Sequence, residues 1–141
     1  MTVIAFDGKT LAADKITVDG SGLRRTVTKI KRVNGHLVAF AGSWDVATEM
    51  RAWWEAGAKP DDFPKSARDS NTVLVVIGPS LISTYNTGPY PIVFEDEKCA
   101  FGSGRDFALA AMHLGCDAEE AVHVACHFQS DCGNGIDTLT L

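Results

Sequence analysis

The chain has 141 residues, 45% of them hydrophobic and 22% charged, which predicts one ordinary globular domain over residues 1–141 with a core of its own. A net charge of −5 without a dense Lys/Arg run argues against a nucleic-acid partner. No apolar run reaches the roughly 18 residues of a membrane span and no signal-like leader is evident, so we expect no membrane partner and a cytoplasmic protein with free thiols at Cys99, Cys116, Cys126 and Cys132.

The first elements in the chain predict a hairpin. Residues 2–6 are apolar and β-prone, Asp7-Gly8 is a turn signal, and residues 10–14 return. If Lys9 belongs to a three-residue loop, paired positions sum to 16 and Thr2 faces Asp14. With a two-residue loop, Thr2 faces Ala13 instead, and Asp14 points to the other side of the sheet.

A second hairpin is predicted from residues 26–33 and 36–41 around an Asn34-Gly35 turn. Its two-residue loop would place Lys29 opposite the apolar Phe40. Lys29 is therefore a candidate for a half-buried lysine rather than a solvated one, although it lies in a basic stretch.

The remaining pattern alternates helices and strands. It predicts a helix over 45–57 with an apolar stripe, an irregular loop over 58–70, strands over 72–77 and 81–85, and a strand near 98–101. Helices follow over 105–114 and 117–128, the latter with an Asp117/Glu120 capping box, and residues 136–141 form a last strand. Antiparallel hairpins on both sides of a helix predict an α+β fold of two packed sheets covered by helices.

Thr2 is the first candidate for chemistry. Removal of Met1 would give one residue both a hydroxyl and a free α-amine. A threonine hydroxyl needs a nearby base to act as a nucleophile, and an α-amine that titrates at about 7.7–8.0 suits that purpose.

The chain resembles the proteasome β-type and HslV-like threonine peptidases of the N-terminal nucleophile hydrolase superfamily, as a short bacterial or phage-type member. Six pieces carry the resemblance in order: Met1–Ala5, Leu11–Asp14, Lys29-Ile30, Ala39–Gly42 followed by Asp45, Phe101–Gly104, and Gly133–Asp137. The resemblance implies a four-layer αββα sandwich of two antiparallel sheets, with a reduced helical layer because only one helix is predicted between Gly42 and Thr72.

The resemblance also implies a site and a reaction. Thr2 would attack a peptide carbonyl, Lys29 would lower the pKa of its hydroxyl, and Asp14 would neutralise Lys29. Ser103 would hold the Thr2 amine or a bridging water. The oxyanion and substrate would be bound by main chain at Ala39, where the family usually has glycine, and near Gly42.

Two departures concern the network around the amine. Gln129 occupies the alignment position of a family aspartate, with Asp131 two residues later, and Cys132 replaces a frequent serine. A retained Met1 would also leave Thr2 without a free amine.

The implied partners are further copies of the chain in a homo-oligomeric ring, single or stacked, an unfolded peptide or protein substrate, and an ATP-dependent unfoldase that feeds it. No cofactor or metal is expected. The alternatives are an inactive ring-forming relative, an amidase acting on non-peptide substrates, and a metal-binding protein that uses His123 and His127 with Cys126 or Cys132.

Overall fold

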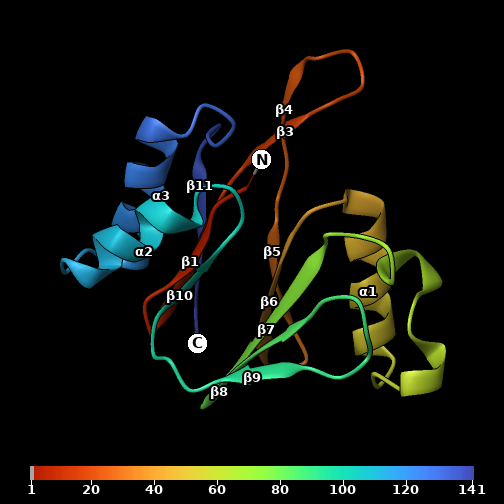
Figure 1. Ribbon diagram of the computed structural model, residues 1–141. Coiled ribbons are helices and arrows are strands. Elements are labelled where there is room, and N and C mark those ends of the chain that lie inside the picture. Colours follow the sequence, from red (N-terminus) through yellow and green to blue (C-terminus); the bar gives the residue numbers. More distant parts are fainter. Residues whose placement is uncertain (1) are drawn as a thin grey trace. The chain divides into compact units, whose positions relative to one another are not determined.

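The structure is a computed structural model that describes residues 2–141 (Figure 1). The chain forms two compact units. The first comprises the N-terminal segment up to Lys31 and the C-terminal segment from Glu97 onward, and the second comprises Arg32–Asp96.

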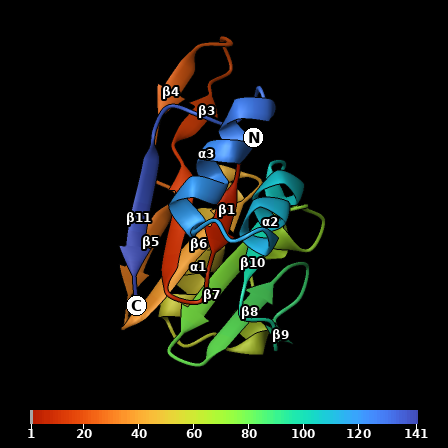
Figure 2. The same cartoon turned by 90° about the vertical axis from the view of Figure 1, so that its left-hand side faces the viewer.

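The first unit is a four-stranded antiparallel sheet covered by two helices (Figure 2). The strand order is β10 (Cys99–Phe101), β1 (Ile4–Phe6), β2 (Thr10–Asp14) and β11 (Ile136–Thr140). Helices α2 (Arg105–His113) and α3 (Ala118–Phe128) pack on it through small side chains, which allow a close approach. The buried contact is made by Val3, Ala5 and Ala12 from the sheet side with Ala108, Met112, Ala121, Val122 and Ala125 from the helices.

A separate two-stranded hairpin, β3 (Ile16–Val18) with β4 (Arg24–Thr26), extends from the end of β2 (Figure 1). The sequence predicts one strand over residues 26–33, and this prediction is wrong. The strand is interrupted at residues 27–29, so that β4 pairs with β3 while β5 (Ile30–Val33) begins a different sheet. Lys29 lies in the interruption and is buried, as expected.

The second unit is a five-stranded sheet with one α-helix. The order is β5, β6 (His36–Ala41), β7 (Val73–Gly78), β8 (Leu81–Tyr85) and β9 (Ile92–Phe94), and β9 was not predicted. Helix α1 (Trp44–Glu55) buries Met50 and Trp53 against β7 and β8, so its aromatic stripe is a core feature. The predicted loop over 58–70 contains two 3-10 turns, η1 (Pro60–Asp62) and η2 (Lys65–Ala67), and no second α-helix.

Both predicted registers of the first hairpin are wrong. Ile4 pairs with Ala13 and Phe6 with Leu11, so that paired positions sum to 17. The cause is Asp7, whose Oδ1 accepts hydrogen bonds from the backbone N–H groups of Lys9 (2.9 Å) and Thr10 (2.8 Å). Asp7 therefore closes the turn as a paired residue and does not belong to the loop, which shifts the partner strand by one position.

Asp7 also holds the start of α3, since its Oδ2 accepts a hydrogen bond of 2.9 Å from the Ala118 N–H. Burial raises the pKa of Asp7, but the N–H donors of Thr10, Ala118 and Lys9 outweigh burial and lower the pKa below its ordinary 3.8. The ionised form is therefore the one that stabilises the fold.

We predict that Asp7→Ala lowers the free energy of unfolding at neutral pH by about 1–3 kcal/mol, because three N–H groups lose their acceptor. Asp7→Asn, which keeps one acceptor oxygen, should lose less. Since folding lowers this pKa, the difference between wild type and Asp7→Asn should be complete well above pH 3.8 and should shrink as the pH falls below it. Urea unfolding at several pH values measures both effects, and a similar loss for the exposed Asp96→Ala would contradict this assignment.

Candidate active site

Thr2 lies two residues before the start of β1, where side-chain and backbone contacts hold it in place. It is 7% exposed. The Lys29 Nζ donates to Thr2 Oγ1 at 3.2 Å, and the Thr2 backbone nitrogen donates to Ser103 Oγ, also at 3.2 Å. The Thr2 carbonyl accepts from the Gly104 N–H at 3.1 Å. The Thr2 hydroxyl thus contacts the Lys29 ammonium, and the Thr2 backbone nitrogen contacts the Ser103 hydroxyl.

Asp14 and Lys29 form a buried ion pair. The distance from Lys29 Nζ to Asp14 Oδ1 is 2.8 Å, and the side chains are 4% and 0% exposed respectively. Oδ1 also accepts from the Val3 N–H at 3.0 Å, and Oδ2 accepts from the Gly133 N–H at 3.0 Å. The lysine thereby bridges the carboxylate and the Thr2 hydroxyl, although Thr2 does not face Asp14 across the hairpin.

A second polar group surrounds Ser103. The Ser103 Oγ can donate to Asp131 Oδ1, 3.2 Å away, and Cys132 Sγ lies 3.8 Å from Ser103 Oγ. Burial raises the pKa of Asp131, but hydrogen bonds from the Gln129 and Ser103 side chains contribute to a net lowering. Asp131 is therefore a charged acceptor at neutral pH. Burial, and then the negative charge of Asp14, raise the pKa of the Cys132 thiol to about 11, so Cys132 stays neutral.

The position of Thr2 depends on the close approach of a glycine turn. A Cβ on Gly102 would lie 2.3 Å from the Thr2 carbonyl oxygen, and Gly102 has a φ of +93°. A Cβ on Gly104 would lie 2.8 Å from the Val3 Cβ. Only glycine fits at these two positions, and for this reason the turn between β10 and α2 can present both the Ser103 hydroxyl and the Gly104 N–H to Thr2.

Ala39 and Gly42 belong to the second unit. Ala39 is buried in β6, where it pairs with Val75 of β7. Gly42 follows β6 with a φ of +121°, and a Cβ there would lie 2.7 Å from the Thr72 Cα. The glycine at 42 thus has a packing reason of its own, and the binding of an oxyanion or substrate by this segment remains a proposal.

His123 and His127 do not form part of a metal-binding cluster among the described residues. His123 and His127 are exposed on α3, and the His127 ring packs edge-on against Phe128. Across residues 2–141, no three His, Cys, Asp or Glu side chains are grouped so that they could hold a metal ion. In the same range, no helix has the length and apolar character needed to cross a bilayer.

The sequence named Gln129, Asp131 and Cys132 as the supporting network and put Gln129 in the place of the family aspartate. In the structure Asp131 contacts Ser103, and Gln129 hydrogen-bonds Asp131. Helix α3 ends at Phe128, as the sequence predicts, Gln129 is its C-cap residue, and Asp131 lies in the turn that follows. Sequence reasoning missed the Val3 and Gly133 N–H groups on Asp14, which no side-chain pattern could reveal.

No protein-family model and no curated protein matches the sequence, but solved structures match the fold. HslV from Trypanosoma brucei is similar with a TM-score of 0.78 and 21% identity, over 100% of this chain and 99% of that chain. BPH from Thiobacillus denitrificans in complex with epoxomicin has a TM-score of 0.72 and 22% identity, over 100% and 98%. A second structure of BPH from the same organism gives 0.69 and 23%, over 100% and 97%.

These likenesses confirm the expected fold: the chain has the N-terminal nucleophile hydrolase fold of the HslV-like, proteasome-type threonine peptidases. At this level of identity, the comparison establishes the fold, and the chemistry has to be argued from the side chains.

We predict that Lys29→Met and Asp14→Asn each lower the free energy of unfolding by about 3–5 kcal/mol, because each leaves a buried group without its partner. The double variant should lose clearly less free energy of unfolding than the two single variants lose in sum. Urea unfolding of all four proteins gives the coupling energy.

The matched control is the neighbouring pair Lys15–Asp137, 2.6 Å apart with side chains 21% and 32% exposed. The cycle Lys15→Met with Asp137→Asn should give a coupling of about 0–1 kcal/mol. Equal coupling energies for the two pairs would contradict a special position for Asp14 and Lys29.

Proposed function

We propose that the protein is a threonine-type endopeptidase that uses Thr2 as its nucleophile once Met1 has been removed. The observation that carries this proposal is the position of Lys29 Nζ, which contacts both Thr2 Oγ1 and Asp14 Oδ1 in a buried setting. A lysine whose charge is balanced by Asp14 stabilises a developing alkoxide on Thr2 in a region of low dielectric. The fold shared with HslV and BPH supports the same conclusion.

The proposed reaction has two steps. First, the Thr2 Oγ attacks the peptide carbonyl while its proton moves to the Thr2 α-amine, directly or through one water. The C–N bond breaks, the leaving amine takes that proton, and an ester on Thr2 remains. Second, water attacks the ester with the α-amine as base, which releases the acid and restores the hydroxyl.

The groups around Thr2 have separate functions in this scheme. Ser103 accepts a hydrogen bond from the Thr2 nitrogen, and the charged Asp131 orients the Ser103 hydroxyl. Gln129 and Cys132 complete the surroundings of Asp131 as neutral groups. The main chain at Ala39 and near Gly42 would bind the oxyanion and the substrate backbone, as the resemblance implies.

We further propose that the two units act as a single domain over residues 1–141 and that copies of it assemble into a closed ring in the cytoplasm. A ring would restrict a general peptidase to unfolded peptide or protein segments. An ATP-dependent unfoldase is the partner class that could supply such segments. Both the ring and this partner rest on the family resemblance.

The second candidate is an inactive ring-forming relative of the same fold. It is favoured if Met1 is retained, because Thr2 then has no free amine. The replacement of an aspartate by Gln129 no longer supports this reading, since Asp131 places a carboxylate beside Ser103.

A peptide epoxyketone distinguishes the two candidates. It offers two electrophilic carbons, and BPH was solved with epoxomicin, so we expect epoxomicin to add once to this chain at Thr2. Intact-mass measurement of protein expressed with a methionine aminopeptidase reports both loss of Met1 and addition of the inhibitor. Thr2→Ala should show no addition, and Thr2→Ser should retain it. Protein that begins at Thr2 yet never gains mass would end the peptidase proposal.

We predict that Asp131→Asn slows epoxomicin addition and peptide hydrolysis by about tenfold or more, because Ser103 loses a charged acceptor. Gln129→Ala should slow both by much less, since Gln129 acts through Asp131. Initial rates with a fluorogenic peptide, compared with unfolding curves of the same variants, test this ranking. The reverse order would restore Gln129 as the supporting residue.

A further inference from the structure

The turn between Cys132 and β11 is hydrogen-bonded to Asp14 on one side and to the β3–β4 hairpin on the other. Gly133, Asn134 and Gly135 all have positive φ, at 152°, 64° and 103°. The Gly133 N–H donates to Asp14 Oδ2 at 3.0 Å, and its carbonyl accepts from the Lys15 N–H at 2.9 Å. Gly133 is therefore hydrogen-bonded both to the Asp14 side chain and to the backbone of the next residue, Lys15.

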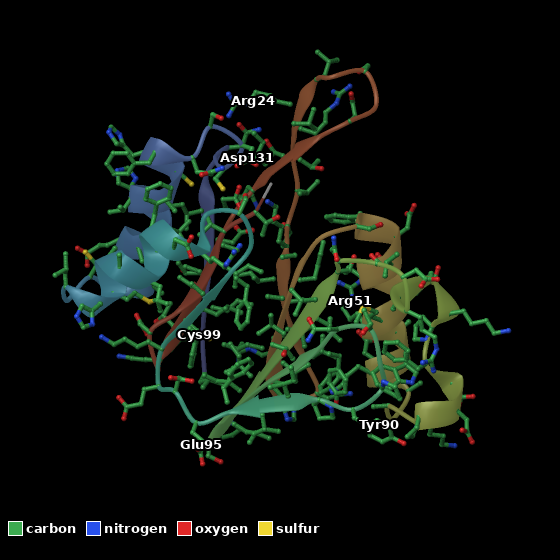
Figure 3. All side chains as sticks on the ribbon, viewed as in Figure 1. Arg24, Arg51, Tyr90, Glu95, Cys99 and Asp131 are labelled. Carbon is green, nitrogen blue, oxygen red and sulfur yellow. The ribbon has the colours of Figure 1, made fainter. Side chains whose placement is uncertain are left out.

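The other side of the turn is attached to β4. Asn134 Nδ2 donates to the Arg25 carbonyl at 3.2 Å and lies 3.5 Å from Thr26 Oγ1. The Arg24 guanidinium lies beside Gly133, with its Nη2 3.3 Å from the place a Cβ would occupy there. Figure 3 shows Arg24 on the hairpin, near the end of the first unit that also carries Asp131.

Only the first residue of the hairpin, Ile16 of β3, is buried in the core. It forms a sheet of only two strands, and all three residues of β4 are exposed. Asp19 organises its tip, with Oδ1 accepting from the N–H groups of Ser21 (2.9 Å) and Leu23 (3.2 Å) and Oδ2 accepting from Arg25 Nε (3.0 Å). Because a two-stranded hairpin is marginally stable by itself, its contacts with the rest of the unit decide where β4 lies.

We propose that Asn134 is a positioning residue that couples the β3–β4 hairpin to Asp14, and through Asp14 to Lys29 and Thr2. This inference rests on the proposed function. The path consists of four hydrogen bonds: Asn134 to the Arg25 carbonyl, the Gly133 N–H to Asp14, Lys29 to Asp14, and Lys29 to the Thr2 hydroxyl. An ordered hairpin holds the Gly133 peptide in place, so the carboxylate keeps Lys29 directed at the nucleophile.

The first variant is Asn134→Gly, which removes the amide and tolerates a φ of 64°. We expect the maximal rate constant of epoxomicin inactivation to fall about 3- to 10-fold, the size associated with loss of one neutral hydrogen bond, while the inhibitor concentration for half-maximal rate stays unchanged. Asn34→Gly is the matched control. Asn34 also has positive φ, at 49°, in the β5–β6 turn, and this change should leave the rate constant as in wild type.

The second variant, Asp19→Ala, loosens the hairpin tip without touching a site residue. It should lower the same rate constant in the same direction. In the double variant Asp19→Ala/Asn134→Gly, the loss should equal that of Asn134→Gly alone, because the hairpin is proposed to act on Asp14 through Asn134. A loss in Asp19→Ala that adds fully to that of Asn134→Gly would overturn the proposal, as would unchanged rates in both single variants.

Hydrogen exchange of the Gly133 amide, measured by NMR, tests the coupling without activity. Exchange should be faster in Asn134→Gly and Asp19→Ala than in wild type and Asn34→Gly. If wild-type protein with a free Thr2 fails to react with epoxomicin, the proposed function fails, and the exchange result alone decides the coupling. Equal Gly133 exchange in all four proteins would overturn the coupling even if the enzyme is active.

Discussion

The buried pair of Asp14 and Lys29 is the interaction on which the first unit depends. Removing two charges from water costs several kcal/mol each, so the pair is tolerable only if hydrogen bonds satisfy the remaining carboxylate oxygens. The Val3 and Gly133 N–H groups do so, and no buried side-chain nitrogen or oxygen within residues 2–141 lacks a partner. The groups that satisfy Asp14 and Lys29 come from four segments: the N-terminal strand, the end of β2, the segment before β5 and the turn before β11. Because these segments meet, the Lys29 ammonium also lies against the Thr2 hydroxyl. The contacts that satisfy the buried ion pair therefore also assemble the candidate active site.

Small residues make this convergence sterically possible. Helices α2 and α3 approach the sheet through alanines, and Gly102 and Gly104 let the turn after β10 approach the backbone of Thr2 and Val3. The nucleophile is thus fixed by main-chain contacts on one side and by a lysine on the other. Positioning and activation are thus done by different groups. Backbone hydrogen bonds hold Thr2 in place, and the charge of Lys29 acts on its hydroxyl.

Local signals in the sequence predicted what local interactions decide. The capping box at Asp117 and Glu120 and the buried face of α1 were both predicted and found. The register of the first hairpin was not predicted. It depends on hydrogen bonds from the Lys9 and Thr10 N–H groups to the Asp7 side chain, which an Asp-Gly pair alone does not indicate. The three residues of β9 are too few for a periodic pattern. The end of α3 at Phe128 was predicted, but the turn that follows it was not, and this turn places Asp131 and not Gln129 beside Ser103.

The position of Asp131 beside Ser103 changes the meaning of Gln129, which stands where the family has an aspartate. A glutamine in place of an aspartate would leave the Ser103 network without charge, whereas the structure puts the charge of Asp131 on Ser103 and uses Gln129 to support it. The Thr2 nitrogen already points at Ser103 Oγ as a peptide N–H. Cleavage of the bond that precedes Thr2 would convert this donor into an amine at the same place, with the hydroxyl already bound by Lys29. Activation would then require one covalent change and no rearrangement of the fold, which is why the chemical state of the Thr2 nitrogen decides between a peptidase and an inactive relative.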